Sequence, residues 1–488
     1  MSIEYAKHQL EASYFLAQRK NAILACATGT GKTLMMILTA LRLLHDGKVS
    51  KCIICATKGS LPEIADDFDK FYSYKPFIFE NTSQMTKFFL SSAPIGLIRY
   101  EWFKKIDPEN FKSYLMKYDC AFFTDEAHKL KNPDTKVFQY VKNIRPALSH
   151  YYPVTATPLM TNLDDLYYTM YLTDPRVLGR YIDFAHAYYN RELVPKFPNL
   201  LKGKCPKCGG FMKYVYGMKV CVRCEHKINV PSKYELVEYK NLDALQKIMT
   251  NYMFCFYPEQ DIRHIIYKAD ISDFKAYYKV AKDLLDNLKD DVSTPFGTRM
   301  INLQYQTSND INKLKLLKNL LDNTLNEGLI IYCHFKQTIE LIQAFLDSLK
   351  IEHKVISGFV NESDRKAAKD WFKSGASNKV LILSQAGGAS LNLQVTPHFC
   401  FYEIPWGYGQ YSQCIGRICR MFSKYKTFYI HYLCLNNTID FYKYECIASY
   451  APVIQQILQN NYVPTGKVKN WNKHIIAQLR NSLCWVNN

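Results

Sequence analysis

The chain has 488 residues, of which 48% are apolar, and Lys and Arg outnumber Asp and Glu by 62 to 44, which makes the formal net charge +18. This length excludes a single hydrophobic core and predicts two or three domains, and the apolar content excludes a chain that is disordered throughout. No apolar run approaches the roughly 18 residues that span a bilayer, so we expect a soluble, intracellular protein without a membrane partner. The positive charge suits a polyanionic partner such as nucleic acid, although a generally basic protein would carry the same charge.

The first part of the chain alternates short apolar runs with helical patterns. We expect strands at residues 21–27, 51–57, 96–100, 120–126 and 150–157, and a helix at 33–47. Short apolar strands that alternate with helices predict a parallel sheet covered on both faces. Residues 1–176 are therefore expected to form one α/β lobe.

A phosphate-binding loop is expected between the first strand and its helix, where residues 26–33 read CATGTGKT. In such a loop the backbone N–H groups and the helix N-terminus attract phosphate oxygens. Lys32 is expected to reach the β- and γ-phosphates of ATP, and the Thr33 hydroxyl to bind Mg²⁺. Cys26 stands where the general pattern has glycine. The residues assigned to ATP binding in this loop are Thr28, Gly29, Thr30, Gly31, Lys32 and Thr33.

The sequence DEAH at residues 125–128 follows another predicted strand. An acidic side chain at the carboxyl end of a parallel strand lies where ligands bind in such sheets. We expect Asp125 to hold Mg²⁺ through water, and Glu126 to orient or deprotonate the water that attacks ATP. His128 either couples this site to a second domain or makes a structural hydrogen bond.

Residues 177–304 break the alternation and are expected to form a helical region between two lobes. Within it, at about 202–228, two C-x₂-C pairs are separated by twelve residues. Pairs with this spacing deliver four thiolates to a structural Zn²⁺ and leave no position for a catalytic water. The basic residues around them either contact nucleic acid or form a solvated surface. The expected zinc ligands are Cys205, Cys208, Cys221 and Cys224.

Residues 305–447 return to the alternating pattern. We expect strands at 328–335, 353–358, 379–384, 398–404 and 427–433, and a helix at 338–350. This pattern predicts a second parallel-sheet lobe, followed by a helical tail at 448–488. The fold class is therefore α/β, with two tandem lobes, a zinc-knuckle insertion and helical linker elements.

The sequence QCIGRICR at residues 413–420 precedes the last expected strand. On a helix, Gln413, Arg417 and Arg420 would share one face. That face would present two guanidinium groups to the γ-phosphate bound in the first lobe, where they would stabilise the charge of the transition state. In isolation the same pattern describes an ordinary basic helix. The residues assigned to catalysis are Lys32, Asp125, Glu126, Gln413, Arg417 and Arg420.

The ordered set of motifs resembles the SWI/SNF-type DNA translocases of helicase superfamily 2. The likeness covers residues 1–175 and 310–445 and includes HQLEA at 8–12, DEAHKLKN at 125–132, TATPLMTNLDDLYYTMYLTDP at 155–175, LILSQAGGASLNL at 381–393 and QCIGRICR at 413–420. The resemblance implies two RecA-like lobes with ATP and Mg²⁺ between them, and a contact of Gln9 with the adenine. By motif position it also implies contacts with the nucleic-acid backbone from Thr57, Lys58, Ser384 and Gln385.

We recognise no histone-reading segment, so the chain resembles a compact viral or phage motor, which would act in the host cytoplasm. We expect a monomeric, nucleic-acid-stimulated ATPase that translocates on duplex DNA and remodels forked or branched DNA in replication, recombination or repair. One alternative is an RNA helicase or transcription-termination motor of the same superfamily. The other is an ATP-gated DNA-binding switch that does not translocate.

Overall fold

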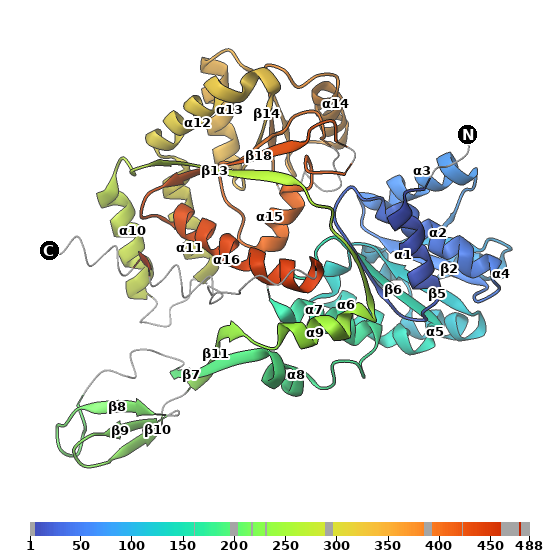
Figure 1. Ribbon diagram of the computed structural model, residues 1–488, viewed down its shortest axis with the longest axis horizontal. Helices are drawn as coiled ribbons and strands as arrows, with labels where there is room; N and C mark the ends of the chain where they lie inside the picture. Colours follow the sequence, from blue (N-terminus) through green and yellow to red (C-terminus); the bar gives the residue numbers. More distant parts are fainter. Residues whose placement is uncertain are drawn as a thin grey trace.

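The computed structural model describes residues 5–160, 162–195, 204–215, 218–229, 232–287, 296–384, 393–421, 423–459 and 478–479. Two α/β lobes, each built on a parallel sheet, make up the body, and a small three-stranded unit lies apart from both (Figure 1). The fold class expected from the sequence is therefore confirmed for the two lobes. Among the described residues, no helix is long and apolar enough to cross a membrane.

The sheet of the first lobe has the strand order β12-β1-β6-β5-β2-β4-β3, and all neighbouring strands are parallel. Leu24 of β1 packs into the layer that contains α1 and α2, whereas Ile23 packs into the layer that contains α7 and α9. Burial on both faces explains why the strand is apolar throughout. The elements of this lobe before residue 176 are α1 (Lys7–Ala17), β1 (Ile23–Cys26), α2 (Lys32–His45), β2 (Lys51–Ala56), α3 (Ser60–Tyr72), β3 (Phe77–Ile78), α4 (Thr82–Leu90), β4 (Ile95–Arg99), α5 (Pro108–Lys117), β5 (Cys120–Thr124), α6 (Lys136–Ile144), β6 (His150–Thr155) and α7 (Leu163–Thr173).

The segment between the lobes contains strands as well as helices. An antiparallel arm of two strands, β7 and β11, leads to the three-stranded unit and back, and the chain then returns to the first lobe. The base of this arm is fixed, because Tyr189 and Tyr239 pack into the core of the first lobe. The elements of this segment are α8 (Tyr181–Tyr188), β7 (Tyr189–Pro195), β8 (Met212–Val215), β9 (Met218–Cys221), β10 (Lys227–Asn229), β11 (Ser232–Tyr239), α9 (Leu242–Thr250) and β12 (Met253–Phe256).

The sheet of the second lobe has the order β13-β18-β17-β14-β16-β15, again with parallel neighbours. Helices α12 and α13 cover one face, and α14 and α15 cover the other. The elements of this lobe are β13 (Asp261–Ala269), α10 (Phe274–Asn287), α11 (Phe296–Ser308), α12 (Ile311–Thr324), β14 (Leu329–Tyr332), α13 (Lys336–Ser348), β15 (Glu352–Ile356), α14 (Glu362–Lys373), β16 (Lys379–Leu383), β17 (His398–Phe401), α15 (Tyr408–Ile415), β18 (Thr427–Leu435) and α16 (Ile439–Gln459).

Two edge strands join the lobes directly. β12 pairs with β1 in the first sheet, β13 pairs with β18 in the second, and only residues 257–260 separate them. The sequence pattern predicts a helical inter-lobe region where both strands lie. An edge strand has a neighbour on one side only, and the residues of β13 are exposed or half-buried, so it lacks the continuous apolar run that marks the central strands.

Helix α16 runs across both lobes. Its first turn packs against α10 and α11 through Ile439 and Tyr442, whereas Val453 and Ile457 pack into the core of the first lobe. The sequence pattern predicts a C-terminal helical tail at residues 448–488. In the structure, residues 448–459 are the second half of a helix that contacts both lobes.

Candidate active site

The glycine-rich loop connects β1 to α2 through two left-handed glycines. Gly29 and Gly31 have φ angles of +76° and +85°, a backbone conformation that residues other than glycine rarely adopt. Both glycines are also crowded. A Cβ atom on Gly29 would lie 2.6 Å from the Arg420 side chain of the other lobe, and one on Gly31 would overlap the Gln9 amide. The loop therefore needs glycine for its turn and for the close approach of its neighbours, and it leads into the N-terminus of α2, where anions bind.

Lys32 lies inside this loop. Its Nζ donates hydrogen bonds to the carbonyl oxygens of Cys26 and Ala27, both at 3.1 Å. Burial lowers the pKa of Lys32, while the nearby carboxylate of Glu126 opposes that effect. Burial also raises the pKa of the Cys26 thiol to about 12, so this side chain is an uncharged, small residue at the start of the loop. A buried ammonium held by neutral carbonyls is suited to the charge of a phosphate group.

The two acidic residues of the DEAH sequence lie at the end of β5. The N–H of Asp125 donates to the carbonyl of Cys55 at 2.8 Å, and the hydroxyl of Tyr100 donates to the carbonyl of Asp125 at 2.7 Å. These bonds fix the backbone where the strand ends. Glu126 follows with a left-handed φ of +52°, and its Oε2 lies 3.1 Å from Nδ1 of His128.

The charged neighbours of the two buried carboxyl groups give them different pKa values. Burial and the neighbouring Glu126 charge raise the pKa of Asp125 to about 7, against the opposing effect of Lys32. Burial would also raise the pKa of Glu126, but His128, Lys32 and Arg417 outweigh it and lower the pKa to about 2. A desolvated carboxyl group such as that of Asp125 favours a bound cation. Thr33, in the first turn of α2, and Asp125 are therefore the residues that would hold Mg²⁺, which would neutralise phosphate charge during hydrolysis.

The N-terminal helix α1 is tied to the glycine-rich loop by two side chains. Gln9 Nε2 donates to the carbonyl of Thr30 at 3.3 Å, and Gln9 Oε1 accepts from the N–H of Ala6 at 3.1 Å. His8 Nε2 lies 2.9 Å from the same Thr30 carbonyl, and its ring stacks on Phe256 with 3.9 Å between ring centroids. The motif at residues 8–12 predicts a role for Gln9 only. It does not predict one for the adjacent His8, or for Phe256, whose position depends on the pairing of β12 with β1.

The arginines of the second lobe do not lie on one helix face, contrary to the sequence prediction. Helix α15 ends at Ile415 with Gly416 as its C-cap, so Arg417 lies in the turn that follows and Arg420 lies beyond that turn. The reason is a contact between lobes: a Cβ atom on Gly416 would overlap the Thr28 side chain of the glycine-rich loop. The chain therefore turns at a glycine where it meets the first lobe.

Both arginines nevertheless face the carboxylates of the first lobe. Burial lowers the pKa of Arg417, while Cys414, Glu126 and Glu63 act in the opposite direction. Burial, together with Arg417, lowers the pKa of Arg420 to about 10, and Glu63 of α3 opposes this. The Arg417 guanidinium, which lies near Glu126, and the Arg420 guanidinium, which lies near Glu63, are suited to stabilise negative charge that develops on a transferred phosphoryl group.

The remaining predicted residues that the structure describes do not lie together in one site. Gln413 lines a small cavity of about 30 Å³ together with Arg417 and Ser384. Thr57 accepts a hydrogen bond from the N–H of Ser60 at the start of α3, and Lys58 beside it is exposed. Gln385 falls outside the described residues. Ser60, which no sequence motif predicts, also belongs to the site, because its side chain is hydrogen-bonded to Asp125.

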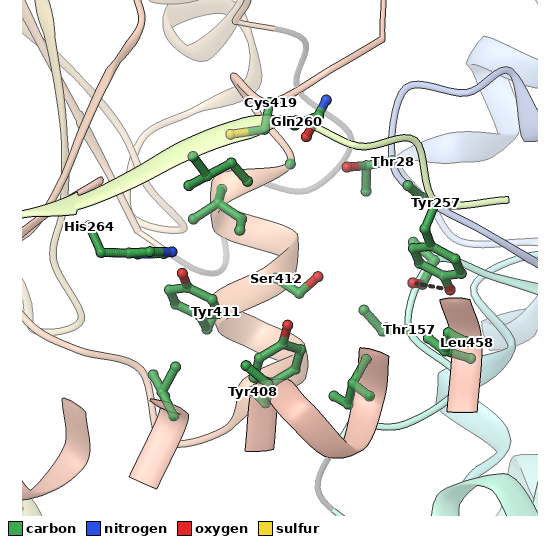
Figure 2. A pocket seen from close by; sticks show the side chains of 18 of the residues that line it. Thr28, Thr157, Tyr257, Gln260, His264, Tyr408, Tyr411, Ser412, Cys419 and Leu458 are labelled. Atoms are coloured by element: carbon green, nitrogen blue, oxygen red, sulfur yellow. Dashed lines mark hydrogen bonds between the residues drawn. The ribbon is translucent and has the colours of Figure 1, made fainter. Parts of the chain in front are cut away.

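A larger cavity of about 690 Å³ lies between the lobes on the side of their connection (Figure 2). Figure 2 shows Tyr411 and His264 on its second-lobe side, opposite Thr28 and Thr157 of the first lobe. Tyr257 of the connection donates to the carbonyl of Ala156 at 3.0 Å. None of the described residues that line this cavity is a lysine or arginine, so it is poorly suited to phosphate groups. Its walls belong to both lobes, so its shape depends on how the lobes are arranged.

The four spaced cysteines come together in the three-stranded unit. Their Sγ atoms all lie within 4.8 Å of one another, with Cys205 and Cys224 3.6 Å apart and Cys208 and Cys221 3.4 Å apart. Tetrahedral zinc with Zn–S bonds of about 2.3 Å requires sulfur atoms about 3.8 Å apart. The sulfur positions therefore fit Zn²⁺ with four thiolate ligands.

The two C-x₂-C pairs have the same local geometry. In each, the residue after the second cysteine has a left-handed φ, +66° at Gly209 and +55° at Glu225. Its N–H donates to the carbonyl of the first cysteine, at 2.8 Å from Gly209 to Cys205 and at 3.0 Å from Glu225 to Cys221. The buried core of the unit consists of Cys205, Met212 and Cys221. A core this small cannot stabilise an independent fold, so the unit depends on a cross-link such as a metal.

Comparison with known proteins identifies relatives of both lobes. The model described as the res subunit of type III restriction enzymes matches residues 2–160, and the model described as the helicase conserved C-terminal domain matches residues 312–422. An uncharacterized ATP-dependent helicase of Bacillus subtilis, YqhH, is 23% identical over 96% of this chain and 82% of its own length.

Other relatives are larger than this chain. The DNA repair and recombination protein RAD54-like of Drosophila ananassae is 22% identical over 86% of this chain and 57% of its own length. The chain covers 21% of the CHD3-type chromatin-remodeling factor PICKLE of Arabidopsis thaliana, with 24% identity over 63% of this chain. The solved SWI2/SNF2 ATPase core of Sulfolobus solfataricus in complex with dsDNA is 17% identical, with 94% of each chain covered and a TM-score of 0.40.

Proposed function

We propose that this chain is a superfamily 2 helicase of the SNF2 type and uses ATP hydrolysis to move along duplex DNA. The ATP-hydrolysing activity follows from the family. One observation supports a link between hydrolysis and movement. The Glu126 carboxylate of the first lobe and the Arg417 guanidinium of the second lobe affect each other's pKa across the cleft. Hydrolysis is therefore coupled to the relative position of the two lobes.

Each lobe has a separate part in the proposed reaction. Lys32 and the glycine-rich loop bind the phosphates, Thr33 and Asp125 hold Mg²⁺, and Glu126 orients or deprotonates the attacking water. Arg417 and Arg420 stabilise the charge of the transition state from the second lobe. No covalent intermediate is required. Loss of the γ-phosphate removes the charge that attracts the arginines, and the lobes separate, which moves one lobe relative to the DNA.

Forked or branched DNA is the proposed substrate, in replication, recombination or repair. The net charge of +18 suits a phosphate backbone, and relatives such as the RAD54-like protein carry names that describe DNA repair and recombination. Thr57, Lys58, Ser384 and Gln385 are the proposed contacts with the backbone. Zn²⁺ is proposed to have a structural role in the unit formed by residues 204–229.

The test is the rate of ATP hydrolysis in the presence of single-stranded, duplex, forked and four-way DNA and of matched RNA. We expect duplex and branched DNA to stimulate hydrolysis and expect the protein to displace a third strand from a DNA triplex. Stimulation by RNA alone would instead identify an RNA motor. Stimulation by DNA without triplex displacement would identify a DNA-binding switch that does not translocate.

A further inference from the structure

The three-stranded unit exposes an apolar pair at its surface. Phe211 is 75% exposed, the largest fraction among the large hydrophobic side chains of the described residues, and Val222 is 66% exposed. The two residues are neighbours, because the N–H of Val222 donates to the carbonyl of Phe211 at 3.0 Å. They come from the two halves of the unit, one before β8 and one between the cysteines of the second pair. We call Phe211 and Val222 the apolar tip.

The apolar tip has no place to be buried within its own unit. Among the residues that the structure describes, the core of the unit consists of cysteines and Met212, and the strands β8, β9 and β10 pair only with one another. Figure 1 shows the unit apart from both lobes, beyond the β7–β11 arm. That arm is seven residues long on the β7 side, which corresponds to a reach of about 20 Å at 3.3 Å per residue. Its base packs into the first lobe, so the tip is carried at a distance from the ATP site by the lobe that holds ATP.

The surroundings of the apolar tip are basic. Within residues 204–215 and 218–229 the only acidic side chain is that of Glu225. The lysines and arginines outnumber it even after the two negative charges of a zinc tetrathiolate are counted, so the surface remains positive. The exposed basic residues are Lys204, Lys207, Lys213, Arg223 and Lys227. These basic residues disfavour a basic partner and favour a polyanion.

We propose that the apolar tip stacks on an unpaired nucleobase of single-stranded DNA next to a duplex, while the surrounding basic residues contact the phosphates. Every base has a flat π-face, but inside a duplex that face is covered by neighbouring pairs, so an aromatic tip can insert beside it only on unpaired bases. Val222 extends the apolar contact beside the ring. The inference rests on the proposed function as a DNA motor and assigns to the zinc unit the recognition of the single-stranded part of a fork.

The test compares Phe211→Ala with the wild-type full-length chain, both shown to contain equal zinc. The probes are a forked duplex with single-stranded arms and a blunt duplex of the same length. We expect Phe211→Ala to weaken binding of the fork about tenfold, a loss typical of one stacked base, and to leave binding of the blunt duplex unchanged. Met116→Ala is the matched control, because Met116 is 72% exposed on α5 of the first lobe, and it should bind both probes as the wild type does.

A second variant reports on stacking itself. Phe211→Trp should keep fork binding, and its tryptophan fluorescence should be quenched by the fork and not by the blunt duplex. Equal binding of the fork by Phe211→Ala and wild type would overturn the proposal, as would equal losses on both probes. In either case, stimulation of ATP hydrolysis by duplex DNA in the wild type would leave the proposed function intact. Failure of every DNA to stimulate the wild type would overturn both.

Discussion

The contact between Gly416 and Thr28 offers a direct test of whether hydrolysis requires the lobes to meet. Gly416 has φ −63° and ψ 0°, which alanine adopts without strain, so Gly416→Ala should leave the second lobe as stable or more stable by up to about 1 kcal/mol. The added Cβ would lie 2.9 Å from Cβ and 3.1 Å from Cγ2 of Thr28, and it would overlap Oγ1. The three heavy atoms nearest to the added Cβ therefore all belong to Thr28 of the other lobe.

The size of the expected fall in kcat follows from the overlap between the added Cβ and the Thr28 side chain. Forcing one extra methyl group into a packed contact costs about 1–3 kcal/mol, which corresponds to a roughly 5- to 140-fold lower population of the closed arrangement. If hydrolysis occurs only in that arrangement, kcat falls by the same factor. Binding of ATP to the first lobe should change little, because Lys32 and the glycine-rich loop are not altered.

The assay is steady-state ATP hydrolysis at saturating DNA, with ATP affinity and the thermal unfolding midpoint measured on the same preparations. Thr28→Ala removes Oγ1 and Cγ2, so the double variant Thr28→Ala with Gly416→Ala should recover part of the lost activity. Thr28→Ala alone is the control for effects on the loop. An unchanged kcat in Gly416→Ala would refute the reasoning, and so would a loss that Thr28→Ala does not reduce.

Three further predictions concern single residues. Glu126→Gln keeps the size of the side chain but removes its charge beside His128. We expect kcat for ATP hydrolysis to fall about 10²- to 10⁴-fold while ATP binding is retained. An unchanged kcat would reject the role of Glu126 as base. Cys208→Ser should lower the zinc content per chain, as measured by metal analysis, and make the unit formed by residues 204–229 sensitive to proteolysis. A wild-type chain without zinc would show that the four thiolates do not form a zinc site. Burial, with His398 nearby, lowers the pKa of His431 to about 3, so the unfolded chain takes up a proton below about pH 6.5 that the folded lobe does not. The free energy of unfolding should therefore fall as the pH decreases from about 6.5 toward 3. Between pH 6.5 and 5, His431→Gln should reduce this fall by about 2 kcal/mol, as measured by denaturant unfolding. An identical pH dependence in the variant would contradict this prediction.

Short-range patterns in the sequence were enough to locate most of the candidate site. The glycine-rich loop, the DEAH residues and the two cysteine pairs each lie within a few positions of one another, and their local backbone dictates how the side chains are presented. The left-handed turns at Gly29, Gly31 and Gly209 are an example, because they depend on the glycine itself. For the same reason the central strands, which are buried on both faces, could be recognised from their apolar runs.

The helix expected to carry Gln413, Arg417 and Arg420 could not be predicted correctly from short-range patterns. A spacing of four and three residues fits a helix, but the chain turns at Gly416 because another lobe occupies the adjacent space. In the same way, β12 and β13 were missed because an edge strand is recognised by its partner and only weakly by its own residues.

The sequence by itself determined which chemical groups are present and which of them are close along the chain: the phosphate loop, the acidic pair, the arginines and the four cysteines. Only the tertiary structure decided that Arg420 lies against Gly29, that Gly416 meets Thr28, that one helix spans both lobes and that Phe211 remains exposed. The physical reason is the range of the interactions. Turns and metal-binding pairs are fixed by bonds between neighbouring residues, whereas contacts between lobes depend on the packing of whole layers that are remote from one another in the chain.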